Sequence, residues 1–156
     1  MYKLKLLLLI LLSINIYAKD IDFDKIIKVS KEQNKQIMVF FHMEHCGWCH
    51  KLIDESLNDK NIKTMINKDF NFISLDVETI GDIIYNNKKI KKLDFARDYE
   101  VYFYPTILIF DNNELVVRIK GYRNKDKFKN IINYIAKKAY KTMTLNEFIK
   151  NQEFDK

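Results

Sequence analysis

Two cysteines separated by two residues constrain this chain more than any other feature of its sequence. Cys46 and Cys49 are its only cysteines, and they follow a short polar turn that ends the apolar, β-prone run 36–41. The residues after Cys46 have helical periodicity, so the turn connects a buried strand to a helix. Cys46 then stands at the helix N-terminus, where free N–H groups and the helix dipole favour a negative charge. Because the thiolate is the nucleophilic form of cysteine, we expect Cys46 to be reactive.

A disulfide between Cys46 and Cys49 would close a very small loop. Such a loop removes little entropy from the unfolded chain, so the bridge would contribute weakly to stability. This spacing is better suited to a disulfide that opens and closes during a reaction. We therefore favour a redox pair over a static disulfide. A redox-inactive interaction domain is a poor explanation for two cysteines at this spacing.

Three histidines in the same segment make a metal site a second hypothesis. His42, His45 and His50 flank the cysteines, and thiolate and imidazole groups are common ligands of Zn²⁺ and Cu⁺. The protein would then carry a metal, copper or zinc, rather than catalyse a reaction. Against this hypothesis, the chain has no second C-x-x-C motif to complete a closed zinc site. One helical turn also cannot easily bring all these side chains to one tetrahedral point.

The first residues have the layout of a secretory signal peptide. Two lysines precede an unbroken apolar run over 6–12, and Ala18 ends a tolerable cleavage site. The apolar run is too short for an ordinary transmembrane helix. We expect residues 1–18 to be a cleaved signal peptide and residues 19–156 to form one exported domain with a short C-terminal helical extension.

The formal charge of +6 is modest and spread along the chain. The lysine-rich segment 88–92 is better explained as the solvated edge of a hairpin, where lysine prevents edge-to-edge pairing, than as a nucleic-acid site. We therefore expect no nucleic-acid partner.

Strand and helix signals alternate along the rest of the chain. The strands expected at 36–41 and 70–77 should be parallel, because a helix connects them. Asn86-Asn87 tolerates the positive φ of a two-residue turn, so a hairpin is expected in which this turn joins the flanking segments 83–85 and 88–90. Helices are expected over 22–34, 46–57, 61–67, 93–99, 125–140 and 144–151, and further strands over 106–110 and 115–119.

This order of elements resembles the thioredoxin superfamily, and two motifs carry the resemblance. These are Cys46-Gly47-Trp48-Cys49 and Tyr104-Pro105-Thr106, which contains the only proline of the chain. The resemblance implies an α/β thioredoxin fold: a central mixed sheet flanked by helices, with an inserted β-hairpin before the cis-proline strand. Within the superfamily, the chain is similar to exported, single-domain, periplasmic thioredoxin-like proteins of bacteria.

The resemblance also implies roles for individual residues. Cys46 would be the attacking nucleophile and Cys49 the more buried resolving thiol, and no cofactor beyond this disulfide and no metal would be needed. Residues expected to contact substrate are Gly47, Trp48, Tyr104, Pro105 and Thr106, and candidates for tuning the pKa of Cys46 are Glu44, His45 and His50.

One position departs from the family pattern. Cytosolic thioredoxins usually carry a buried acid six residues before the first cysteine, and this position is Phe40 here. The acid helps to move the proton of the second thiol, so the proton must take another route. Water or the exposed Glu44 are the two routes that the sequence suggests.

The expected activity is thiol:disulfide exchange in the periplasm. We favour a monomeric enzyme that reduces disulfides of exported proteins and is itself reduced by a membrane electron-transfer partner. Trp48 stands between the cysteines where strong oxidants often have a histidine, which favours the reducing direction. A disulfide oxidase or isomerase remains an alternative, as does the metal carrier.

Overall fold

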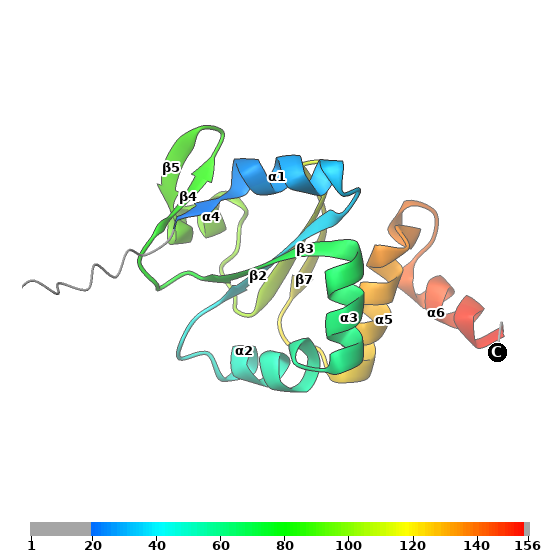
Figure 1. Cartoon of the computed structure of the whole chain (residues 1–156). Helices are drawn as coiled ribbons and strands as arrows, with labels where there is room; N and C mark the ends of the chain where they lie inside the picture. The colour runs from blue at the N-terminus through cyan, green and yellow to red at the C-terminus, as the bar shows by residue number, and fades with distance from the viewer. Residues whose placement is uncertain (1–19, 155–156) are drawn as a thin grey trace, which may run out of the picture.

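The computed structural model describes residues 20–154, and a four-stranded mixed sheet forms its centre (Figure 1). The strand order is β3-β2-β6-β7. Strands β2 and β3 are parallel, whereas β6 is antiparallel to both β2 and β7. The bounds are β2 Gln36–His42, β3 Phe70–Asp76, β6 Thr106–Asp111 and β7 Glu114–Lys120. The sheet therefore has the mixed, central character that we expected.

Helices cover both faces of this sheet, and each face has its own apolar core. Alternate residues of a strand point to opposite faces, so Phe41 packs in one core and Phe40 in the other. Helices α1 Phe23–Glu32 and α4 Lys92–Asp98 lie on the first face; α2 Gly47–Leu52, α3 Lys60–Asp69 and α5 Lys125–Ala136 lie on the second (Figure 1).

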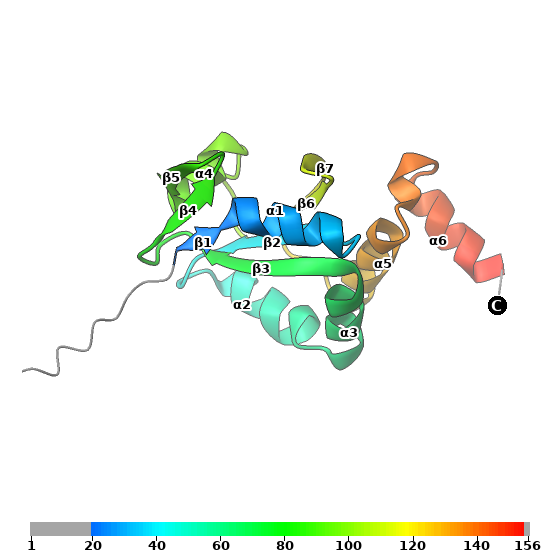
Figure 2. The ribbon, with the colours of Figure 1, turned by 45° about the horizontal axis from the view of Figure 1, so that its top comes forward.

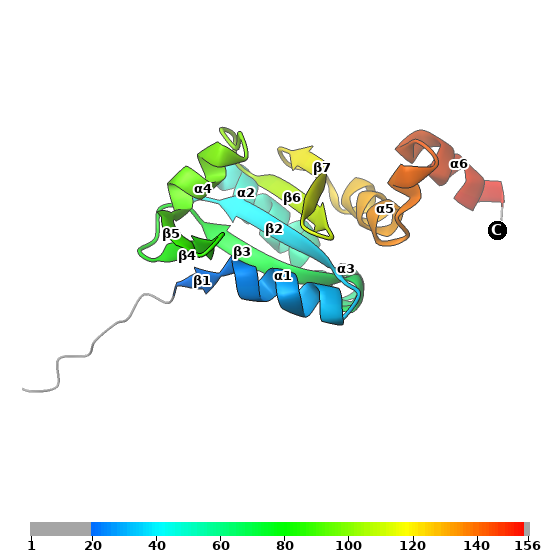
Figure 3. The same ribbon diagram turned by 90° about the horizontal axis from the view of Figure 1, so that it is seen from above.

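The predicted hairpin is present and belongs to a second, small sheet. Strands β4 Asp82–Tyr85 and β5 Lys88–Lys91 are joined by two asparagines, Asn86 and Asn87, with φ of 52° and 59°. The Asp24 carboxylate accepts hydrogen bonds from both asparagine N–H groups. The sequence did not predict β1 Ile21–Asp22, a two-residue strand that pairs in parallel with β4 beside the start of α1 (Figure 3).

Two helical regions differ from the expectation. The helix after Cys46 continues as a π-helix, η2 Ile53–Leu57. The helix expected over 125–140 ends at Ala136, because Lys138 adopts a left-handed conformation with φ of 52°. The chain then forms a 3₁₀ turn, η3 Ala139–Lys141, and α6 Leu145–Phe154, which projects beyond the sheet (Figure 2).

The proposed signal peptide, residues 1–18, lies outside the described residues. Within residues 20–154, no helix is long and apolar enough to cross a membrane.

Candidate active site

The register of the central sheet brings the two sequence motifs to the same edge. Phe41, near the end of β2, is paired with Thr106, the first residue of β6. Because these strands are antiparallel, the chain leaves β2 toward Cys46 beside the point where it enters β6 from Pro105. The Tyr104–Pro105 peptide bond is cis.

Hydrogen bonds hold the entrance to β6 in place. The hydroxyl of Thr106 donates to the carbonyl of Phe103 at 2.7 Å. The N–H of Gly121, just after β7, donates to the carbonyl of Pro105 at 2.7 Å. Tyr104 is half-buried and contacts both apolar cores, and this burial raises the pKa of its hydroxyl despite the opposing effect of Arg97.

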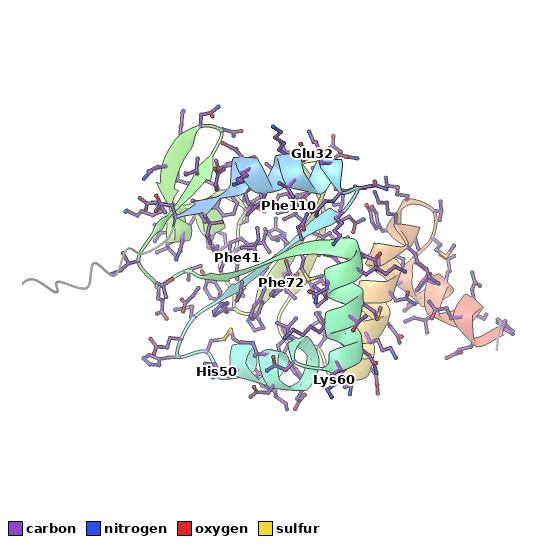
Figure 4. All side chains as sticks on the ribbon, in the orientation of Figure 1. Glu32, Phe41, His50, Lys60, Phe72 and Phe110 are labelled. Atoms are coloured by element: carbon purple, nitrogen blue, oxygen red, sulfur yellow. A yellow bond between two sulfur atoms is a disulfide. The ribbon has the colours of Figure 1, made fainter. Side chains whose placement is uncertain are left out.

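Cys46 and Cys49 form a disulfide at the start of α2 (Figure 4), with an S–S distance of 2.06 Å and a Cα–Cα distance of 5.2 Å. Cys46 is the N-cap residue, and the backbone N–H of Cys49 donates to its sulfur at 3.2 Å. The two residues differ in burial: Cys46 is partly exposed, whereas Cys49 is 0% exposed. Only Cys46 is therefore open to an incoming thiol or disulfide.

Cys49 is packed in an apolar core. Phe40, Leu52 and Ile107 belong to the same buried cluster and are each at most 2% exposed. Phe40 thus fills the position of the usual buried acid with a fully buried ring. This position therefore supplies no carboxylate that could take the proton of the Cys49 thiol.

An aromatic rim stands beside the disulfide. Trp48 is 60% exposed, and its ring lies 5.4 Å from the ring of Tyr122. The ammonium of Lys51 lies over both rings, 5.5 Å and 5.0 Å from their centroids. The Tyr122 hydroxyl donates to the Glu55 carboxylate, which raises the pKa of Tyr122. The sequence identified Trp48 but not Tyr122, which comes from a distant part of the chain.

The turn before Cys46 is held by contacts that the sequence did not indicate. Glu44 is exposed, and its backbone N–H donates to the Glu78 carboxylate at 3.0 Å. The Nε2 atom of His50 lies 2.6 Å from the carbonyl oxygen of Glu44. The ring of His50 is thus engaged with the backbone of the turn, and His45 is exposed. Tuning of the Cys46 pKa by Glu44, His45 and His50 stays a prediction.

His42 was not among the candidates for tuning the pKa of Cys46, but its ring has two defined contacts. Its ring stacks on Phe40, with 4.8 Å between centroids, and its Nε2 lies 2.8 Å from the Ser74 hydroxyl oxygen. Burial lowers the pKa of His42; Asp76 opposes this effect and His50 adds to it. The signal in the sequence was its place two residues after Phe40, on the same face of β2.

The metal-carrier hypothesis gains no support from this geometry. Among residues 20–154, no three His, Cys, Asp or Glu side chains are grouped so that they could hold a metal ion. The two sulfurs are bonded to each other, and the rings of His42 and His50 have other partners.

Comparison with known proteins agrees with this architecture. A family model described as a thioredoxin-like domain matches residues 23–136. Structures with a similar fold include a thioredoxin-fold protein from Helicobacter pylori, with 19% identity and a TM-score of 0.64, covering 78% of this chain and 86% of that one. The DsbH oxidoreductase has 17% identity and a TM-score of 0.59, over 76% and 84% of the two chains. The oxidised C-terminal domain of DsbD from Neisseria meningitidis has 15% identity and a TM-score of 0.54, over 74% and 97%.

Comparison with curated proteins gives no match. At these identities the solved structures show a shared fold. The family model also shows the family of the chain, because it spans both the cysteine pair and the loop with the cis-proline. The chain belongs to the thioredoxin-like family, and its Cys46–Cys49 pair makes it a thiol:disulfide oxidoreductase.

Proposed function

We propose that this protein reduces disulfides of exported proteins in the periplasm and that Cys46 is its attacking nucleophile. The observation that carries this proposal is the unequal burial of the two cysteines at a helix start, with Cys46 accessible and Cys49 fully buried. This difference in exposure supports an order of steps in which the substrate reacts first with Cys46.

In the first step, the Cys46 thiolate attacks one sulfur of a substrate disulfide and releases the other as a thiolate. The result is a mixed disulfide between Cys46 and the substrate. In the second step, the Cys49 sulfur attacks Cys46, restores the Cys46–Cys49 bond and frees the second substrate thiol. Two electrons pass to the substrate, and an electron donor must reduce the pair again. We assign this role to a membrane electron-transfer partner.

The surroundings of Cys46 support the reducing direction. Its sulfur accepts one hydrogen bond, from the N–H of Cys49, and Trp48 rather than a histidine stands between the cysteines. The ring of His50 contacts the carbonyl of Glu44. The helix terminus contributes only about 0.3–1 kcal/mol to a nearby negative charge in an exposed setting. A strong oxidant needs a far more stable thiolate, so a disulfide oxidase or isomerase is the second candidate.

The surface next to Cys46 is suited to a polypeptide substrate. Trp48 offers an exposed ring beside the disulfide. The second motif lies at the same edge of the sheet, with Tyr104 partly exposed and Pro105 and Thr106 buried behind it. Export rests on the pattern of residues 1–18. Separation of the periplasm from the cytoplasm, followed by mass measurement of the processed chain, tests that part of the proposal.

A trapping experiment tests the order of attack. Cys49→Ser should hold substrates as mixed disulfides on Cys46, because the second step is lost. Cys46→Ser is the matched control and should hold almost none, because Cys49 is buried. Equal trapping by the two variants, or disulfide reduction that survives Cys46→Ser, would contradict the assignment.

A further inference from the structure

The second chemical step requires a proton acceptor for Cys49. A thiol must lose its proton to become a nucleophile, and Cys49 is 0% exposed among apolar side chains. The position of the usual acid is the fully buried ring of Phe40. A group outside that position must therefore take the proton.

We propose that His42 accepts the proton of Cys49, through one water, during the resolving step. This inference rests on the proposed function, since it concerns the same reaction. Its basis is the position of His42 at the end of β2, four residues before Cys46. Phe40 and His42 share this face because strand residues alternate, and Phe40 packs in the cluster that contains Cys49.

One contact places the His42 ring next to this cluster. It stacks on Phe40 with 4.8 Å between the centroids and 20° between the planes. The charge of His50, the residue after Cys49, also lowers the pKa of His42. His42 is the last residue of β2 and, like Phe40, faces the side of the sheet on which Cys49 is buried.

The proton also has a way out to solvent. The Nε2 atom of His42 lies 2.8 Å from the hydroxyl oxygen of Ser74, which is exposed on β3. Phe40 and Ser74 both line an open pocket of about 200 Å³ between the sheet and helices η2 and α3. Because Ser74 borders this pocket and His42 does not, a proton from His42 would reach solvent through the Ser74 hydroxyl.

The charges around His42 suit a base at neutral pH. Asp76, on β3, favours the protonated ring, and His50, on α2, disfavours it. Burial is the larger effect and lowers the pKa of His42 below its usual value of 6.5. The ring is therefore neutral at pH 7, which is the form that accepts a proton.

In the mixed disulfide, the Cys49 Sγ–H bond breaks and the proton passes to His42. The Cys49 sulfur attacks the Cys46 sulfur, the bond between Cys46 and the substrate breaks, and the Cys46–Cys49 disulfide forms. The substrate sulfur leaves as a thiolate with both electrons of the broken bond, and protonated His42 returns its proton to solvent past Ser74.

The reaction of the reduced protein with an aromatic disulfide, 5,5′-dithiobis(2-nitrobenzoate), separates the two steps. One coloured thiolate is released when Cys46 forms the mixed disulfide, and the second when Cys49 resolves it. His42→Gln keeps a group that can hydrogen-bond Ser74, and His42→Phe keeps the stack on Phe40. Both variants remove the base. If His42 acted only through its hydrogen bond or only through its stack, at least one variant would keep the wild-type rate of the second step.

We expect the first phase to be unchanged in both variants and the second to slow by about 100-fold at pH 7, the lower end of what a positioned general base contributes. The wild-type second phase should rise with pH to a plateau above the lowered pKa of His42, and the variants should lose this inflection. Added imidazole should accelerate the second phase of His42→Ala. A normal first phase with an unchanged second phase in His42→Gln would overturn the role of His42. Loss of the first phase in the wild type would instead overturn the proposed function.

Discussion

Replacement of Asp111 by asparagine should destabilise the protein without affecting its chemistry. Asp111 ends β6, and its side chain is 7% exposed. Its carboxylate accepts hydrogen bonds from Lys138 at 2.8 Å and from the Tyr140 hydroxyl at 2.9 Å, and it pairs with Lys141 at 3.2 Å. These contacts hold the segment after α5 against the sheet, at the opposite end of β6 from Pro105.

The free-energy cost of Asp111→Asn follows from these contacts. Removing one partner of a buried ion pair costs about 3–5 kcal/mol. The two lysine side chains are 36% and 54% exposed, so they can return to water and the loss falls at the lower end, about 3 kcal/mol. With an m-value of about 2 kcal/mol/M, the urea midpoint should fall by about 1.5 M.

The stability lost in Asp111→Asn should also depend on pH. Burial alone would raise the pKa of Asp111, but the hydrogen bonds from Lys138, Tyr140 and Lys141 outweigh it and lower the pKa. Stabilisation by this carboxylate is therefore complete above the ordinary value of about 3.9 and is lost as the pH falls through the folded-state pKa. The difference between wild type and Asp111→Asn should shrink in the same range.

Urea unfolding at pH 7 and at pH values below 4 measures both effects, with Asp94→Asn as the control. Asp94 pairs with Arg97 at 3.2 Å, and both side chains are more than half exposed. Such surface pairs contribute about 0–1 kcal/mol. Equal shifts of the urea midpoint for the two variants would refute the argument from burial. Slower thiol exchange in Asp111→Asn would contradict the expectation that the chemistry is unaffected.

Two further predictions concern a helix cap and the rim of the site. Asp59 caps α3 through the N–H groups of Asn61 and Ile62 and pairs with Lys125 at the start of α5. Asp59→Ala should therefore lower the urea midpoint more than Lys125→Ala, and the reverse order would show that the cap matters little. Trp48→Ala should leave the rate with a small aromatic disulfide unchanged but slow the reduction of a protein disulfide, because the exposed ring contacts only a large substrate; equal slowing of both reactions would contradict this role.

Local chemistry was enough to predict much of the fold. The run 36–41 became the fully buried part of β2, and Asn86-Asn87 formed the expected turn because asparagine tolerates positive φ. The change from strand to helical periodicity likewise predicted Cys46 at a helix N-terminus, where it caps α2. Each of these features depends on residues that are close in sequence.

The features that were missed depend on distant residues. Strand β1 is two residues long and exists because β4 pairs with it. Helix α5 was expected to reach Tyr140 but ends at Ala136, where Asp111 of the sheet holds the following lysines. The Tyr122 ring beside Trp48 and the Ser74 hydroxyl beside His42 also come from other strands or loops. No local pattern could indicate these neighbours.

The reduction potential of the Cys46–Cys49 disulfide tests the central claim most directly. The protein is equilibrated with defined ratios of reduced and oxidised glutathione, and the fraction of free Cys46 and Cys49 is measured by alkylation and mass spectrometry. A pair that cycles in disulfide reduction should have a potential near the thioredoxin value of about −270 mV. A potential near −120 mV, as in strong oxidants, would reverse the proposed direction. A value well below about −300 mV, typical of structural disulfides, would contradict a redox role for the pair altogether.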